Sequence, residues 1–234
     1  MYPRAQLWCI WAIFPFILIY LIGFIGLAGF VPPTAPSMAS AQLVEFYNAN
    51  RIGIRGGQLI CLIVSPLFLC WAAAVSAQMA RVEKGALPML SLLQFGSALI
   101  LTVFFMLCSL VWSVAAYRED MSPELLRLVH DTGWLFFVMA YPEYLVQLGC
   151  IAVIGLMDKS VQPLFPRWLC YFTIWTETVG IGGGFSTFVK SGPFAWNGLF
   201  GFWIPVAFFL IWLVVTLPYF MAAIKRQMKE SVND

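Results

Sequence analysis

The sequence predicts an all-α protein, a polytopic bundle of transmembrane helices. Of the 234 residues, 62% are hydrophobic and 10% are charged, whereas soluble domains are about 45–50% apolar and about 25% charged. The apolar residues gather in long continuous runs, and only helices or closed barrels satisfy their backbone hydrogen bonds in lipid. Because the runs lack the apolar–polar alternation of barrel strands, we expect helices.

A helix needs about 20 apolar residues to cross the hydrocarbon layer of a bilayer. Six runs reach this length, which predicts a single transmembrane domain over residues 1–234. The first run is longer than the roughly 7–15 apolar residues of a cleaved signal peptide, so we expect it to be a retained helix. The predicted spans are residues 7–31, 58–80, 89–117, 133–157, 168–189 and 198–224.

The segments before the second and fourth spans carry helix-start signals. The proline-rich stretch 32–36 is expected to be extended, and either Ser37 or Ser40 can then cap a short helix. The segment from Ser122 to Glu124 supplies an N-cap, a proline at the first helical position and an acid in the first turn. We expect both segments to form short interfacial helices on the outer face of the membrane.

Lysine and arginine residues are distributed unevenly between the two sides of the predicted bundle. Cytoplasmic loops of membrane proteins carry an excess of these residues. With the N-terminus inside, eight of the 13 basic residues fall in inner segments and five in outer loops. We therefore predict that both termini are cytoplasmic. The inner residues are Arg4, Arg81, Lys84, Lys159, Arg167, Lys225, Arg226 and Lys229.

Glu143 and Glu177 are the basis of the functional prediction. Both are expected near the middle of the bilayer, where an acid costs at least about 2.5 kcal/mol. No Lys, Arg or His is expected at that depth to neutralise them. We expect both side chains to face the protein interior and to act as the acid and base of a catalytic site. A structural role, as protonated acids that hydrogen-bond between helices, stays open.

Polar and aromatic residues near the two acids are candidates for the wall of a ligand pocket. Gln147 lies four residues after Glu143 and therefore on the same face of a helix. Nearby threonines can line a pocket or bond the carbonyls of their own helix, and both alternatives stay open. The predicted ligand-binding residues are Trp134, Tyr144, Gln147, Thr173 and Trp175.

Two other motifs have predominantly structural interpretations. His130 and Asp131 are adjacent, so they do not face each other on a helix, and we expect them at the membrane interface. The glycine-rich stretch 180–184 has no preceding strand and no following Lys-Ser or Lys-Thr pair, which excludes a phosphate loop. We expect this stretch to allow close helix packing or local unwinding.

The cysteines do not indicate a metal site. The chain has six cysteines, none in a C-x-x-C pair, and one histidine. Zinc and iron–sulfur sites need clustered ligands. We therefore expect no metal or other cofactor, and we expect the cysteines to be small buried hydrophobic residues.

Three stretches of the chain resemble a family of uncharacterised six-span bacterial inner-membrane proteins. They are residues 46–55, which begin with Phe46-Tyr47, residues 122–137, and residues 165–198, which include Phe165-Pro166-Arg167-Trp168 and Gly192-Pro193-Phe194-Ala195-Trp196-Asn197-Gly198. The resemblance covers most of the chain. It implies six spans and a location in the bacterial inner membrane, but no function or functional residue.

These observations leave three functional hypotheses. The first is an intramembrane pocket for a lipophilic small molecule, with acid–base isomerisation or cyclisation of a terpenoid or steroid as its reaction. The second is a proton- or cation-coupled transporter that uses the same acids. The third is a non-catalytic subunit or scaffold of a membrane complex. Expected partners are lipids or a lipophilic molecule, with a second copy or another subunit left open. The net charge of +2 does not indicate nucleic acid.

Overall fold

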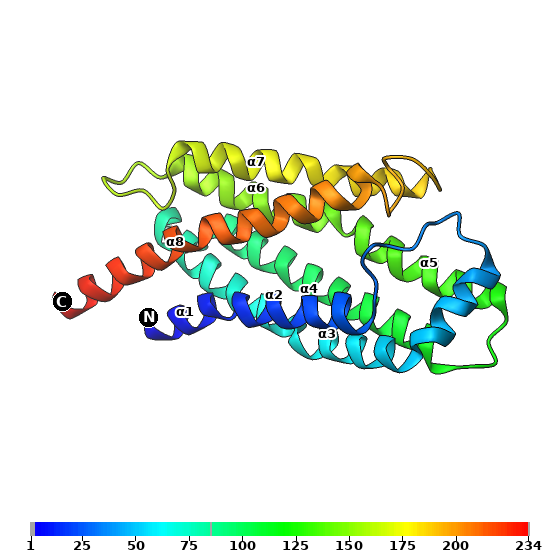
Figure 1. Cartoon of the computed structure of the whole chain (residues 1–234). Coiled ribbons are helices and arrows are strands. Elements are labelled where there is room, and N and C mark those ends of the chain that lie inside the picture. The colour runs from blue at the N-terminus through cyan, green and yellow to red at the C-terminus, as the bar shows by residue number, and fades with distance from the viewer. Residues whose placement is uncertain (1–2, 85, 234) are drawn as a thin grey trace.

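The computed structural model is a bundle of long helices (Figure 1). It describes residues 3–84 and 86–233, with only the backbone described for 231–233. These residues contain no strand, which confirms the all-α prediction. Within the described residues, five helical segments are long and apolar enough to cross a membrane, as expected of a multi-pass membrane protein. They are Pro3–Leu27, Ser40–Glu83, Met89–Tyr117, Pro123–Met157 and Leu199–Glu230.

The first span contains three successive helical pieces. These are α1 (Pro3–Trp11), α2 (Ile13–Leu21) and the π-helix η1 (Ile22–Leu27). The α-helix is interrupted at Ala12, where Pro15 supplies no N–H for the carbonyl of Trp11. All three pieces of this span pack against α3 (Ser40–Glu83).

Helix α3 contains the first predicted surface helix. Its backbone leaves the helical conformation at Asn50, with φ −139° and ψ 32°, so its first ten residues form a separate segment. The N-cap is Ala39, and the Ala39 N–H donates to the side chain of Gln42. The prediction that Ser37 or Ser40 caps this helix was therefore wrong, because a glutamine one turn inside satisfies the free N–H instead.

The second predicted surface helix is the start of a longer one. Helix α4 (Met89–Tyr117) leads to α5 (Pro123–Met139), where the Ser122 hydroxyl accepts the Leu125 N–H at 3.3 Å, as predicted. Helix α5 continues into the bundle, so the surface segment and the outer part of the predicted fourth span are one helix. A break at Ala140 separates it from α6 (Tyr141–Met157), just before Pro142.

The fifth predicted span is the least regular. It corresponds to α7 (Arg167–Gly180), of 14 residues, followed by the 3-10 helix η2 (Ile181–Thr187). Helix α7 lies along α6 (Figure 1). The glycine-rich stretch allows close packing, as predicted, since a Cβ at Gly183 would lie 2.3 Å from the Val138 carbonyl oxygen. Its backbone is wound more tightly than an α-helix and is not unwound. The chain then passes through the π-helix η3 (Leu199–Trp203) into α8 (Ile204–Asn233).

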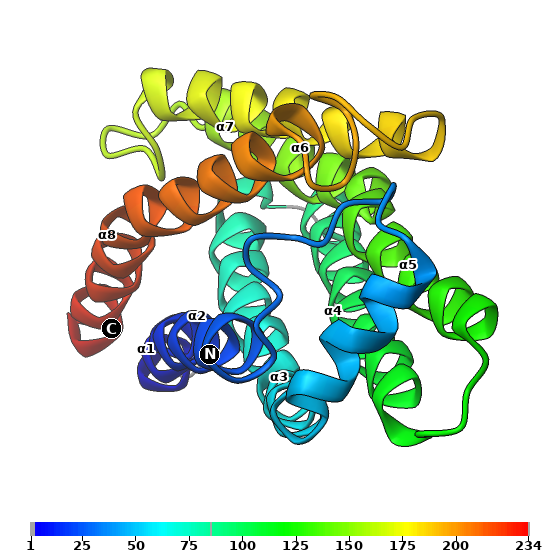
Figure 2. The same ribbon diagram turned by 45° about the vertical axis from the view of Figure 1, so that its right-hand side comes forward.

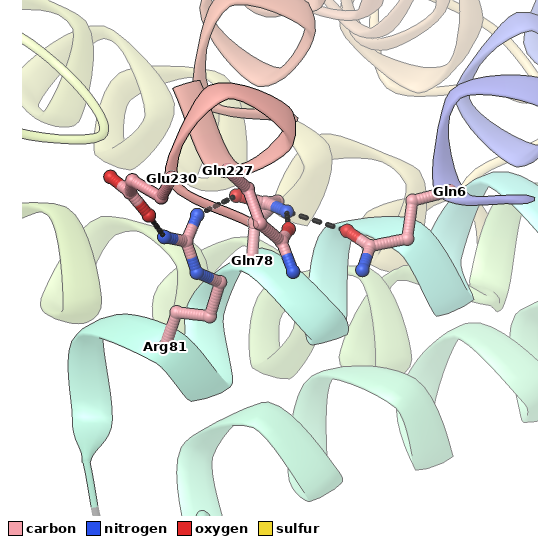
Figure 3. Close-up of polar contacts among 5 residues, drawn as sticks. All are labelled: Gln6, Gln78, Arg81, Gln227 and Glu230. Carbon is pink, nitrogen blue, oxygen red and sulfur yellow. Dashed lines mark hydrogen bonds and ion pairs between the residues drawn. The ribbon is translucent and has the colours of Figure 1, made fainter. Parts of the chain in front are cut away.

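Both ends of the described chain lie at the same end of the bundle (Figure 1). There Gln78 of α3 donates to Gln6 of α1 at 2.5 Å and to Gln227 of α8 at 2.8 Å (Figure 3). Arg81 bonds Glu230 of α8 at 2.5 Å. Helix α8 packs on α1 here and moves away from α2 toward the opposite end (Figures 1 and 2).

Candidate functional site

Helices α8 and α2 diverge toward one end of the bundle (Figure 2). An apolar cavity of about 430 Å³ is lined by residues of both helices. Its walls come from α2, η1, α4, α5, α6, the end of α7, η2, η3 and α8. They are almost entirely aliphatic or aromatic. The wall residues with a polar side-chain group are Tyr20, Tyr141, Tyr144 and Trp203, and the Tyr20 hydroxyl itself is buried.

The cavity reaches the outer surface of the bundle. Ile25 of η1 and Trp203 of η3 line it, and each is 42% exposed. Ala207 of α8 also lines the cavity and is exposed. In a bundle that crosses a membrane, exposed apolar residues on these helices face lipid. The rim therefore opens sideways between the first and last spans.

Tyr144 is the predicted ligand-binding residue that lines this cavity. Its ring packs edge-on against Phe209 of α8, with centroids 5.6 Å apart. Its hydroxyl donates a long hydrogen bond of 3.4 Å to the carbonyl of Thr176 in α7. Tyr144 therefore connects the cavity wall to the segment that carries Glu177.

Trp134 packs behind the cavity wall. It is fully buried and contacts Phe137 and Phe202, both of which line the cavity, at centroid distances of 6.1 and 6.0 Å. Its ring also lies 6.0 Å from that of Phe24, another wall residue. Trp134 thus fixes the positions of aromatic side chains that shape the cavity.

Neither predicted acid lines the cavity. Glu143 and Glu177 are both half-buried, and among the described residues neither has a hydrogen-bond partner. The Glu177 carboxyl lies against Gly149 of α6, where a Cβ would be 3.4 Å from Oε1 and 3.6 Å from Oε2. Glu177 therefore sits at the α6–α7 contact, one helix behind the wall formed by Tyr144.

The other three candidates do not converge on one point. Thr173 is buried, donates to the carbonyl of Leu169 at 2.8 Å and accepts the Trp212 indole N–H at 2.9 Å. Trp175 is 58% exposed and points away from the bundle. Gln147 is fully buried, and within the described residues neither atom of its amide has a hydrogen-bond partner. The sequence pattern thus identified one wall residue and several packing residues.

His130 is the centre of a buried hydrogen-bond cluster that the sequence did not predict. Only 2% of it is exposed, although it was expected at the membrane interface. Its Nε2 accepts the Trp134 indole N–H at 3.0 Å and lies 2.7 Å from the Thr34 hydroxyl. Its Nδ1 lies 2.9 Å from the Tyr47 hydroxyl.

The partners of His130 fix its tautomer. An indole N–H can only donate, so Nε2 must be the acceptor. The proton of the neutral ring is then on Nδ1 and is donated to the Tyr47 hydroxyl. The Thr34 carbonyl also accepts the Trp196 indole N–H at 2.7 Å. The cluster therefore connects the chain after the first span to α3, to α5 and to the segment before η3. Most of these residues are far apart in sequence. Only the four-residue spacing of His130 and Trp134 could be read from the sequence alone.

The cysteines and acids of the described residues make no cluster of three or more metal-ligating side chains. Four cysteines are buried, as predicted, but Cys9 is half-buried and Cys70 is exposed, so the prediction was wrong for these two. The buried cysteines are Cys61, Cys108, Cys150 and Cys170.

Comparison with protein-family models, with curated proteins and with solved structures found no match to this chain. The resemblance to six-span bacterial proteins therefore stays a prediction.

Proposed function

We propose that this chain binds a lipophilic small molecule inside the membrane, in the cavity between its first and last spans. The observation that supports the proposal is an apolar cavity of about 430 Å³ with a rim at exposed Ile25 and Trp203. Ligand pockets typically measure about 300–1,000 Å³ and are lined mainly by apolar and aromatic side chains. A ligand dissolved in the bilayer would enter through the side of the bundle without crossing water.

The wall chemistry favours a hydrocarbon with a single polar end. Three tyrosines and one tryptophan line the wall, with no charged side chain among the lining residues. A charged ligand would lose its hydration without a counter-charge. The hydration that a terpenoid or steroid alcohol or ketone would lose is small, because its one hydroxyl or carbonyl group can bond a tyrosine instead of water.

Acid–base conversion of this ligand is the second part of the proposal. Isomerisation or cyclisation needs a proton donor at the wall. Tyr144 lines the wall, and its hydroxyl would exchange the long bond to the Thr176 carbonyl for a bond to the ligand. Glu177 lies in the same α6–α7 contact. In this scheme Tyr144 touches the ligand and Glu177 is a positioning residue behind it, whereas Glu143 has no described contact with the wall.

The proposed location is the bacterial inner membrane, with both termini in the cytoplasm. The excess of basic residues at the end that holds both termini supports this orientation. A reporter active only in the cytoplasm should work when fused to the C-terminus. It should be silent when inserted at Glu119, in the turn between α4 and α5. The reverse pattern would overturn the orientation.

The binding proposal is tested by filling the cavity. Val206 lines it from α8, so Val206→Phe should weaken binding of farnesol, a terpenoid alcohol, at least tenfold when tryptophan fluorescence is followed in detergent. The matched control is Val214→Phe on the same helix, which is 59% exposed and lies outside the wall. Equal affinities for the two variants, or no saturable binding by the natural chain, would refute a terpenoid site in this cavity.

A further inference from the structure

A second pocket, of about 720 Å³, lies at the end of the bundle that holds the termini. The end of α3, the loop from α6 to α7 and the last turns of α8 form its wall. Figure 3 shows one side of it, where Gln78, Arg81 and Glu230 meet. In contrast to the apolar cavity, this pocket is lined largely by charged and amide side chains.

Basic groups dominate the wall once its acids are accounted for. Glu230 is paired with Arg81 at 2.5 Å. The Asp158 carboxylate accepts the N–H groups of Ser160 at 2.9 Å and Leu164 at 2.7 Å. Both acids of the wall are therefore engaged in holding the local structure. Glu230 cancels the charge of Arg81, and the three other cations face the single carboxylate of Asp158, so the wall stays positive.

Three cations remain around the pocket. They are Lys84 at the end of α3, Lys159 in the α6–α7 loop and Arg226 on α8. Among the described side chains, none of these three cationic groups makes a hydrogen bond, and Arg226 has only a longer-range attraction to Asp158. The Arg226 side chain is nevertheless half-buried, an arrangement that is stabilised when an anion accepts its N–H groups.

We propose that this pocket binds a phosphate group, that of an anionic phospholipid headgroup. Arginine bonds phosphate through two parallel N–H groups, and lysines add charge from the sides. Basic pockets between transmembrane helices on the cytoplasmic side are suited to anionic headgroups. Val82, Met157 and Ala223 also line the pocket, so an apolar surface lies beside the cations for the acyl chains of a lipid.

The general excess of basic residues at this end does not account for the pocket. Lys225 and Lys229 are on the same helix as Arg226, but they are exposed and lie outside the wall. A charge that served only to orient the chain in the membrane would not need to be half-buried beside two other cations. Lys225 therefore provides an internal control. The proposal does not depend on the apolar cavity.

The test measures binding to the full chain in a neutral detergent by titration calorimetry. The probes are dioctanoyl phosphatidylglycerol, dioctanoyl phosphatidylcholine and inorganic phosphate. Removal of one basic charge near an anionic lipid should weaken binding about fivefold. We expect this loss for phosphatidylglycerol in Arg226→Gln and in Lys159→Gln, and less than a twofold change in Lys225→Gln. Lys159 is exposed in a loop, so its variant is informative even if Arg226→Gln folds poorly.

The probes distinguish the source of the phosphate. Preferential binding of phosphatidylglycerol over phosphatidylcholine, lost in the two pocket variants, supports a lipid headgroup. Binding of inorganic phosphate with the same variant pattern, and no added affinity for the lipid, overturns the lipid and leaves a free phosphate as the ligand. Equal losses in Lys225→Gln and the pocket variants, or binding of neither anion, overturn the site.

Discussion

The carbonyl oxygen of Val138 faces Gly183 so closely that a Cβ at Gly183 would lie only 2.3 Å from it. Pro142 lies four residues after Val138 and has no N–H, so it cannot bond this carbonyl. The chain breaks at Ala140, and the tightened backbone of η2 packs into the break. Val138 and Gly183 both line the apolar cavity, so the proline and the glycine together shape its wall.

Gly183→Ala should therefore destabilise the bundle by about 1–3 kcal/mol, the usual cost of forcing extra atoms into a packed interior. The obstacle is a backbone atom, which cannot rotate away as a side chain could. Thermal unfolding of the purified variant in detergent measures the change. Gly96→Ala is the control, because a Cβ at Gly96 would meet nothing within 4 Å. Similar melting temperatures for both variants would contradict this account of the contact.

Local signals in the sequence predicted the elements well. The cap of Ser122 on Leu125 depends on residues within one helical turn, so their types and spacing suffice. The short first segment of α3 was also predictable from the proline-rich stretch before it. Its capping residue was not, because Gln42 competes with two serines for the same role.

The side-chain arrangement was harder to predict because it depends on how each helix is rotated. Thr173 and Trp175 lie two residues apart, yet one is fully buried and the other is 58% exposed. Tyr47 and His130 are 83 residues apart in sequence and meet only after α3 and α5 pack. No periodicity in a single helix specifies such a meeting, which is why the cluster around His130 was missed.

The bond from Trp134 to His130 should contribute measurably to stability. Trp134→Phe keeps an aromatic ring but removes the N–H that His130 accepts, and loss of a buried hydrogen bond costs about 1–3 kcal/mol. Thermal unfolding in detergent should show this loss. In the control, Trp175→Phe, an exposed ring is replaced, and the change should stay within about 0.5 kcal/mol. A Trp134→Phe variant as stable as the natural chain would show that the hydrogen bond is dispensable.

Asp158 should make the connection between α6 and α7 sensitive to acid. Partial burial opposes ionisation of this carboxyl, but the N–H groups of Ser160 and Leu164, with Arg226, hold its pKa below the usual range. A carboxyl with a lowered pKa in the folded state stabilises the fold above its unfolded pKa of about 3.9. That contribution is lost as the pH falls through the lower folded value.

Asp158→Asn should therefore lower the melting temperature at pH 7, and the difference from the natural chain should shrink below about pH 4. Melting curves in detergent across this range provide the measurement. Asp120→Asn is the control, because Asp120 is exposed in the loop between α4 and α5. A difference for Asp158→Asn that is constant with pH would mean that the lost contacts are not those of the ionised carboxylate.

Glu177→Gln should separate binding from chemistry in the proposed site. The carboxyl lies against Gly149 and outside the cavity wall, and glutamine has nearly the same shape. The variant should therefore fold, and its affinity for farnesol should change less than about twofold. Tyr144→Ala removes a wall residue and should weaken binding at least tenfold.

If Glu177 positions Tyr144 for proton transfer, solvent extracts of the purified natural chain should contain two related lipophiles. Extracts of Glu177→Gln should contain only one of them, as mass spectrometry would show. Identical pairs in both extracts would remove Glu177 from the reaction, and weak binding by Glu177→Gln would instead place its carboxyl in contact with the ligand.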